Sequence, residues 1–232
     1  PAPRFGHVEI DGSICTTVLQ TPPFQLLTTR GEPENMAALA DGVLGHGWDG
    51  PGVQGEAASV RFFGEAWCAS TGQTLKSGMK SRGHVLHKVV MPTLPLGRAR
   101  PAEKPDVGLL AGWIEAFAEE VDTAVSRDAR EVAENGVKTG RLWVWDHEGP
   151  VSIAGWGNAT DNAMQIGTVY TPPALRGKGY ASAVTASLSK YLLEQGFSFC
   201  CLYTDLANPT STKIYRQIGY EPVWDSRRYS FE

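Results

Sequence analysis

The segment from Ile166 to Ser182 constrains the fold more than any other part of the chain. It begins with β-branched and aromatic residues up to Tyr170, which favour a buried strand. Pro172 and Pro173 cannot donate to a strand ladder, so they end it. A small basic loop follows, and from Tyr180 apolar residues recur at helical spacing. Such a loop presents unpaired N–H groups at the positive end of a helix dipole, which predicts an anion site suited to a diphosphate.

Three phosphate-binding patterns compete for this loop. The kinase-type P-loop needs Ser or Thr after its Lys, but Lys178 is followed by Gly179, so this pattern is excluded. The dinucleotide fingerprint G-x-G-x-x-G is met at Gly177 and Gly179, but Ser182 stands at the third glycine, which disfavours it. The third pattern, R-x-x-G-x-A, matches at Arg176, Gly179 and Ala181. An ordinary helix start with solvated basic side chains is the alternative to all three.

Composition narrows the class of protein. The 232 residues are 42% hydrophobic and 20% charged, as in a globular protein, and no apolar run approaches the roughly 20 residues of a membrane span. The four cysteines, of which Cys200 and Cys201 are adjacent in an expected strand, show no metal-binding spacing. We therefore expect free thiols, no metal and a cytoplasmic protein.

The formal net charge of −4 arises in residues 101–232, where acidic side chains outnumber basic ones. An acidic half argues against a nucleic-acid partner. It is compatible with a cationic acceptor such as an amine.

The first 91 residues predict a small α/β unit. Asp11-Gly12 is a two-residue hairpin signal between the strands 5–9 and 13–19. We expect a strand at 24–29, helices at 33–44 and 56–70, a strand at 85–91, and an irregular Gly-rich stretch at 46–55. Residues 92–97 are rich in Pro and small side chains, which predicts a linker between the domains 1–91 and 98–232.

The second domain alternates between strands and helices. Strands are expected at 97–101, 141–146, 151–156, 163–170 and 197–203, with a terminal hairpin formed by 220–224 and 228–231. Helices are expected at 106–121 and 128–134, from Tyr180 to the C-cap Gly196, and from Asn208 to Ile218. The pattern predicts a mixed α/β (α+β) fold with helices beside a central sheet.

This order of elements resembles the GNAT superfamily of N-acetyltransferases over about residues 98–232. The resemblance depends on the loop at 176–181 and on Asn208-Pro209-Thr210-Ser211, followed by Tyr215 and Gly219-Tyr220. It implies a GNAT fold with a mixed, mostly antiparallel sheet flanked by helices. It also implies acetyl-CoA as cosubstrate.

The resemblance assigns roles to particular residues. Backbone groups of Val169, Tyr170 and Thr171 would bind the pantetheine arm as a pseudo-strand, and one N–H group could hold the oxyanion. The diphosphate would be held by the loop and first helical turn, which comprise Arg176, Gly177, Lys178, Gly179, Tyr180, Ala181 and Ser182. On the next helix, Asn208 and Ser211 would contact the arm.

Tyr215 is the candidate acid for the departing thiolate. Asn208 and Tyr215 are seven residues apart, almost two helical turns, and so share a face. A plain N-cap for Asn208 and a core aromatic for Tyr215 are the alternative interpretations. A base must deprotonate an alkyl amine at pH 7. Four carboxylates are possible bases, each with a surface role as the alternative: Glu119, Glu120, Asp146 and Asp205.

The N-terminal unit echoes the C-terminal order and carries Thr21-Pro22-Pro23, a twin of Thr171-Pro172-Pro173. We expect a degenerate GNAT-like half. Arg30-Gly31 is followed by acidic residues, which would repel a diphosphate, so this half is not expected to bind CoA. Its expected tasks are to pack on the catalytic half, to wall the acceptor cleft or to support a homodimer.

The sequence is compatible with three functions. The first is an acetyl-CoA-dependent N-acetyltransferase in which a primary amine of a small molecule or peptide attacks directly. The second is a non-catalytic acyl-CoA-binding or regulatory module. The third, disfavoured by Ser182, is a dinucleotide-binding oxidoreductase. The sequence predicts neither a nucleic-acid nor a membrane partner.

Overall fold

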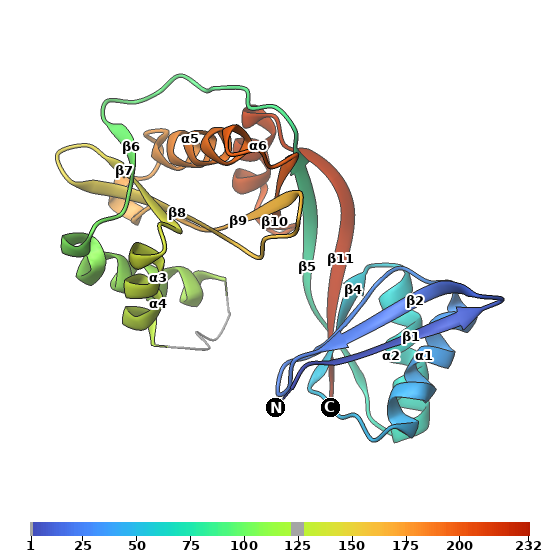
Figure 1. Cartoon of the computed structure of the whole chain (residues 1–232). Helices are drawn as coiled ribbons and strands as arrows, with labels where there is room; N and C mark the ends of the chain where they lie inside the picture. Colours follow the sequence, from blue (N-terminus) through green and yellow to red (C-terminus); the bar gives the residue numbers. More distant parts are fainter. Residues whose placement is uncertain (1, 122–127) are drawn as a thin grey trace. The chain divides into compact units, whose positions relative to one another are not determined.

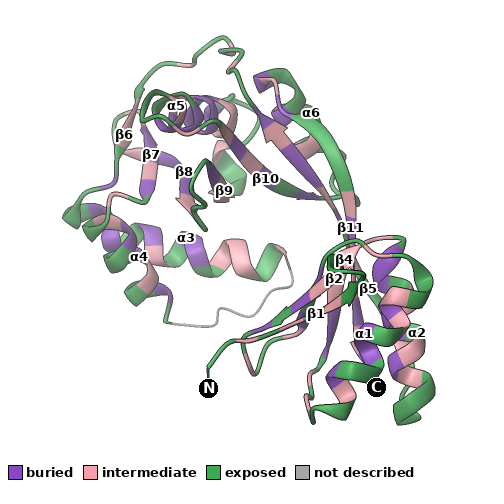
Figure 2. Cartoon of the chain, turned by 45° about the vertical axis from the view of Figure 1, so that its right-hand side comes forward, coloured by how far each residue is buried: buried purple, intermediate pink, exposed green. Residues whose placement is uncertain are grey.

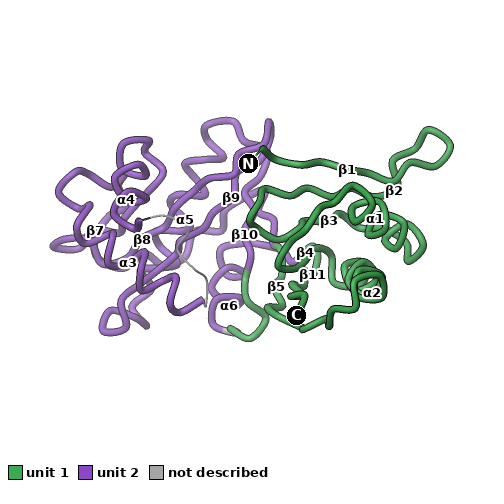
Figure 3. Tube along the Cα trace, turned by 90° about the horizontal axis from the view of Figure 1, so that it is seen from below, with its two compact units in different colours: residues 1–83, 204–208, 223–232 green, residues 84–203, 209–222 purple. Residues whose placement is uncertain are grey.

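The computed structural model describes residues 2–121 and 128–232. Its chain divides into two compact units (Figure 3). The first unit contains residues 1–83, 204–208 and 223–232, and the second contains 84–203 and 209–222. The predicted domains 1–91 and 98–232 with the linker 92–97 remain predictions. Compact packing divides the chain at different residues, because the C-terminal strand belongs with the first unit.

Helices and strands alternate along the chain (Figure 1). The N-terminal elements are β1 Arg4–Ile10, β2 Ser13–Gln20, β3 Leu26–Thr28, α1 Pro33–Gly45, β4 Gly52–Glu56, α2 Ser59–Thr71 and β5 Leu75–Leu86. Next come β6 Arg98–Pro101, the 3-10 turn η1 Lys104–Asp106, α3 Val107–Glu120, α4 Ala129–Lys138, β7 Leu142–Asp146, β8 Pro150–Gly157 and β9 Ala163–Tyr170. The last elements are the 3-10 turn η2 Pro173–Leu175, α5 Tyr180–Glu194, β10 Phe199–Asp205, α6 Pro209–Ile218 and β11 Glu221–Phe231.

The N-terminal hairpin is confirmed. Ile10 pairs with Ser13 across the turn, and Asp11 and Gly12 both have positive φ, 50° and 76°. Two successive positive φ values match the twist of antiparallel strands, and Asp-Gly tolerates them better than most residue pairs.

The core of the first unit lies between its strands and the helices α1 and α2. Met36 of α1 and Val60 and Phe63 of α2 are fully buried, and Val60 and Phe63 are three residues apart, as on one face of a helix. Figure 2 shows buried and exposed stretches alternating along α1 and α2. Trp67 of α2 stacks on Phe231 of β11, with ring centroids 4.8 Å apart. The C-terminal strand therefore belongs to this core.

The second unit has helices on both faces of its sheet. Leu142 and Val144 of β7 belong to a cluster with α3 and α4, whereas Trp145 belongs to a cluster with α5. Adjacent strand residues point to opposite faces, so the two clusters form two core layers. Trp113 of α3 reaches the ring of Tyr170 at 6.4 Å. The sheet is mixed and mostly antiparallel, with β6 to β9 antiparallel and β9–β10 parallel, as predicted.

The two halves repeat one order of elements. The series β1, β2, β3, α1, β4, α2, β5 has the same order as β7, β8, β9, α5, β10, α6, β11. In both, the third strand pairs in parallel with the strand after the first helix. The repeated order of elements expected from the sequence is therefore confirmed, and the assignment of the N-terminal half as a degenerate GNAT-like unit stays a prediction.

The last strand of each half continues into the other unit. β5 begins in the first unit and ends in the second at Leu86. β11 returns to the first unit, where residues 226–230 pair antiparallel with 52–56 of β4.

Three predicted elements are wrong. The terminal hairpin is one continuous strand, because Arg82 holds Asp225 through two hydrogen bonds of 2.6 and 2.8 Å and Ser226 is buried. The stretch predicted as irregular contains β4. There, Gly52 is needed because a Cβ would lie 2.1 Å from the Tyr229 carbonyl oxygen. The strand predicted at 85–91 is the end of β5, which begins at Leu75.

The other boundaries shift by a few residues. α4 continues past Asn135-Gly136 to Lys138, and Gly136 inside it packs against Leu142 where a Cβ would not fit. No described helix is long and apolar enough to cross a bilayer.

Candidate functional site

β9 and β10 separate partway along their length. Their parallel pairs are Ala163–Phe199, Met164–Cys200 and Gln165–Cys201, after which no pairing joins them within the described chain. β9 nevertheless continues to Tyr170 and β10 to Asp205. A gap between parallel strands leaves backbone groups of one strand available to an extended ligand. The predicted pantetheine-binding residues, Val169 to Thr171, follow this point of separation.

A β-bulge lies just before these residues. On the other side of β9, the register passes from Gly155–Gly167 to Ile153–Tyr170, so β9 holds one extra residue. Thr168 takes a left-handed φ of 50°, which is unusual for a β-branched residue. A bulge bends a strand and redirects its side chains. It therefore sets the orientation of Val169 and Tyr170.

Ser152 of β8 fixes the end of β9. Its hydroxyl donates to the Tyr170 carbonyl at 3.0 Å and lies 2.8 Å from the Thr171 hydroxyl. Because the Ser152 proton is used on Tyr170, the Thr171 hydroxyl donates to Ser152. Both Ser152 and Thr171 are buried, so the predicted binding strand has a rigid end.

The loop before α5 has the geometry of an anion site. Gly177 and Gly179 have φ of 78° and 83°, and an added Cβ would meet nothing closer than 4.0 Å. Conformation, rather than space, therefore requires glycine. The first turn of α5 has no acidic residue and no side-chain cap, and its first bond is Ala183 N–H to Gly179 O at 3.0 Å. The N–H groups of 180–182 are thus directed at the loop.

Arg176 is engaged inside the second unit. Its Nε donates to the Thr171 carbonyl at 2.9 Å, and its Nη2 pairs with Glu120 at the end of α3. Its Cζ lies 5.7 Å from the centre of the Tyr170 ring. In this structure Arg176 joins the loop to β9 and α3. Its predicted contact with a diphosphate remains a prediction.

Tyr215 lies in the same buried cluster as Tyr180, the first residue of α5. Its ring meets Tyr220 edge-on at 5.9 Å. Burial raises the pKa of the Tyr215 hydroxyl far above its ordinary value. No side-chain hydrogen bond to that hydroxyl is found among the described residues, so the hydroxyl has spare capacity to donate.

Asn208 and Ser211 stand at the start of α6. Asn208 is exposed and directly precedes the helix, and its N–H donates to the Asp205 carbonyl at 3.0 Å. Asn208 is counted with the first unit, whereas Ser211 and the loop belong to the second. The predicted contact of both residues with the pantetheine arm remains a prediction.

The four candidate bases have different surroundings. Asp146 accepts from Arg100 Nε at 2.6 Å and from the Gly149 N–H at 3.0 Å, and the Arg100 hydrogen bond chiefly lowers its pKa. A carboxylate held in this way is a weak base. Asp205 accepts the Ala207 N–H at 2.8 Å, Glu120 pairs with Arg176, and Glu119 is exposed.

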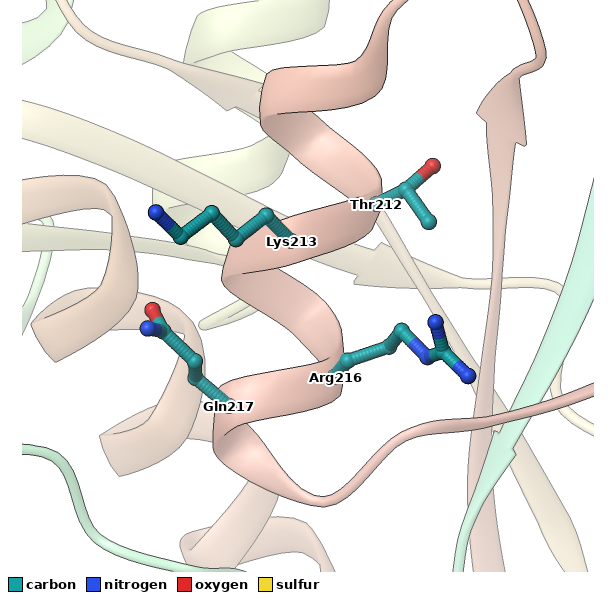
Figure 4. Close-up of a pocket in the computed structure, with 4 residues that line it drawn as sticks. All are labelled: Thr212, Lys213, Arg216 and Gln217. Atoms are coloured by element: carbon teal, nitrogen blue, oxygen red, sulfur yellow. The ribbon is translucent and has the colours of Figure 1, made fainter.

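A hollow of about 460 Å³ lies on α6, and its lining residues include Thr212 and Arg216, the sequence neighbours of Ser211 and Tyr215. Figure 4 shows Thr212 and Arg216 directed to one side of the helix and Lys213 and Gln217 to the other. All four come from one helix, so the hollow is a shallow surface feature. Within residues 2–121 and 128–232, no group of three or more potential metal ligands is found.

The N-terminal counterpart of the site is closed. β3 and β4 lie close together at their ends. A Cβ added to Gly55 would lie 2.4 Å from the Thr28 hydroxyl and 2.8 Å from the Thr28 carbonyl oxygen, so no ligand fits between them there. The Gly31 N–H donates to the Ser59 hydroxyl at 3.1 Å, and that hydroxyl donates to Glu56 at 2.8 Å. These contacts fill the region where the second half has its separated strands and long loop.

Sequence reasoning missed Ser152, the bulge at Thr168 and the pairing of Arg176 with Glu120. The partners in these contacts are 18 and 56 residues apart, and only the strand register and helix packing bring them together. A β-branched residue with positive φ has no sequence signature.

Comparisons with known proteins agree with this topology. The family model described as FR47-like protein matches residues 146–229. The uncharacterized N-acetyltransferase YjgM of Escherichia coli (strain K12) is 28% identical over 85 residues, or 35% of this chain and 51% of that protein. The matched region thus spans about half the length of this curated relative.

Solved structures are similar over almost the whole chain. A GNAT-family acetyltransferase from Colwellia psychrerythraea has a TM-score of 0.66 at 14% identity, covering 98% of this chain and 85% of that one. A tandem GNAT protein from the clavulanic acid biosynthesis pathway has a TM-score of 0.52 at 11% identity, covering 100% and 83%. Identities this low show a shared fold. The chain therefore has the fold of GNAT-family acetyltransferases, and its residues 146–229 are similar in sequence to the FR47-like family.

Proposed function

We propose that the chain is an acetyl-CoA-dependent N-acetyltransferase that moves an acetyl group to a primary amine. The separation of β9 from β10 beside an uncapped, Gly-containing helix start carries this proposal. The FR47-like match at 146–229 includes both features. A strand gap and an anion site at its open end suit a ligand with an extended amide-bearing arm and a diphosphate.

The residues present fit the cosubstrate. Backbone groups of 169–171 would hold the pantetheine arm, and the N–H groups of 180–182 would hold the diphosphate, with the exposed Lys178 adding charge. Bound acetyl-CoA supplies an activated acetyl thioester. The buried Ser152–Thr171 hydrogen bond keeps the strand end fixed, so little ordering is needed at binding.

Tyr215 is the proposed donor to the thiolate. Its raised pKa keeps the hydroxyl protonated throughout the physiological range, so it offers a hydrogen bond wherever negative charge develops on sulfur. The thiolate is the weaker base, with an ordinary pKa of about 8.5. A hydrogen bond from Tyr215, rather than full proton transfer, is therefore the expected role.

The acceptor is proposed to be a small-molecule or peptide amine. The net charge of −4 favours approach of a cation over approach of a nucleic acid. The lowered pKa of Asp146 disfavours it as the base, so Glu119, Glu120 and Asp205 remain the candidates for accepting the amine proton through a water molecule.

Release of free thiol from acetyl-CoA across a panel of amines tests the proposal. An acetylated amine identified by its mass supports the proposed activity, and Tyr215→Phe should lower kcat. A chain that binds CoA stoichiometrically but acetylates no amine is a binding module instead, which is the second function proposed from the sequence.

A further inference from the structure

The guanidinium of Arg176 is held on two sides by neutral groups and on the third by an acid. Nε donates to the Thr171 carbonyl at 2.9 Å, and the Tyr170 ring lies 5.7 Å from Cζ. The carboxylate of Glu120 takes Nη2. The carbonyl and the ring fix the position and plane of the guanidinium, so its ionic partner can be exchanged without moving the loop.

Glu120 is suited to such an exchange. It is the last residue of α3, and its side chain is 45% exposed, as is 47% of the Arg176 side chain. An ion pair this exposed contributes little to stability. A diphosphate carries more charge than one carboxylate and offers paired oxygens to the guanidinium fork.

We propose that Glu120 is a built-in competitor of the CoA diphosphate for Arg176. Glu120 occupies the guanidinium in the free protein, and the diphosphate displaces it, so that filling the loop releases the C-terminal end of α3. This inference depends on the proposed function, because it requires that the loop at 176–182 binds the diphosphate. The inference predicts that removing the negative charge of Glu120 strengthens the binding of CoA.

The expected change in CoA affinity can be derived from the strength of the Arg176–Glu120 ion pair. Exposed ion pairs are worth about 0.2–1 kcal/mol, so losing the competitor should tighten CoA binding up to about fivefold. The effect requires Arg176, and it should therefore disappear when Arg176 is replaced.

The experiment compares CoA affinity by calorimetry in the wild type, Glu120→Gln and Glu115→Gln. Glu115 is an exposed acid on the same helix, so its variant has the same change in net charge and helix composition. The same comparison is repeated in an Arg176→Gln background. Thermal melting of each variant checks that it folds.

The expected result is tighter binding by Glu120→Gln than by Glu115→Gln, with no difference between them when Arg176 is Gln. Equal or weaker binding by folded Glu120→Gln overturns the inference and leaves the pair as a scaffold between α3 and the loop. If the wild type does not bind CoA, the proposed function fails, and this inference fails with it. If the wild type binds CoA and Glu120→Gln has no effect, only the inference fails.

Discussion

Gly179→Ala separates the anion-binding role of the loop from its contribution to stability. Gly179 has φ 83° and ψ 1°, and only Pro95 Cδ, at 4.0 Å, would approach an added Cβ. The substitution therefore causes no clash. Its cost is the left-handed conformation, which is about 1–2 kcal/mol for an L-residue.

Gly140 provides the matched control. It has φ 68°, it has nothing within 4 Å of an added Cβ, and it lies in the turn between α4 and β7. Both alanine variants should lower Tm by a similar amount, about 2–8 °C for a chain of this size. Only Gly179→Ala strains the N–H groups at the start of α5.

The assay is CoA affinity by calorimetry beside thermal melting. A hydrogen bond to a charged group is worth about 1.5–3 kcal/mol, so losing one N–H contact to the diphosphate weakens binding by about tenfold or more. Gly140→Ala should bind CoA as the wild type does. If the two variants lose equal stability and bind CoA equally well, the loop is not the diphosphate site.

Three further predictions concern other parts of the chain. Tyr215→Phe should keep the fold and lower kcat, and no loss of rate near pH 10 should arise from Tyr215, because its raised pKa keeps it protonated there. Because the folded protein holds the Tyr215 hydroxyl protonated, this residue stabilises the fold fully below the ordinary tyrosine pKa of 10, and the stabilisation is lost as the pH rises above that value. Urea unfolding should therefore show that Tyr215→Phe loses less stability in alkali than the wild type. Calorimetry should give one CoA per chain, and Gly179→Asp should abolish it, since the N-terminal counterpart is filled by Gly31, Ser59 and Glu56; a surviving second site would contradict the closed geometry. Arg100→Met should cost about 3–5 kcal/mol in urea unfolding, because Asp106, 9% exposed, loses its partner at 2.7 Å; a loss below about 1 kcal/mol would show that water replaces the pair.

Most helices and the antiparallel strands of the second unit were predictable from the sequence. The hairpin at Asp11-Gly12 and the succession of β9, loop and α5 depend on local chemistry, namely φ preferences, proline stops and apolar periodicity. β4 and the terminal strand were not predictable, because their glycines and polar residues are explained by partners distant in sequence. Gly52 leaves room for the carbonyl oxygen of Tyr229, and Asp225 accepts hydrogen bonds from Arg82.

The candidate site divides in the same way. The sequence by itself determined which residues make the loop, the helix start and the face of α6, since each depends on neighbours within a few positions. Only the tertiary structure decided that β9 leaves β10 after Gln165, that β3 does not leave β4, and that Arg176 meets Glu120. Strand register and helix packing set these contacts, and both depend on surfaces brought together from segments tens of residues apart.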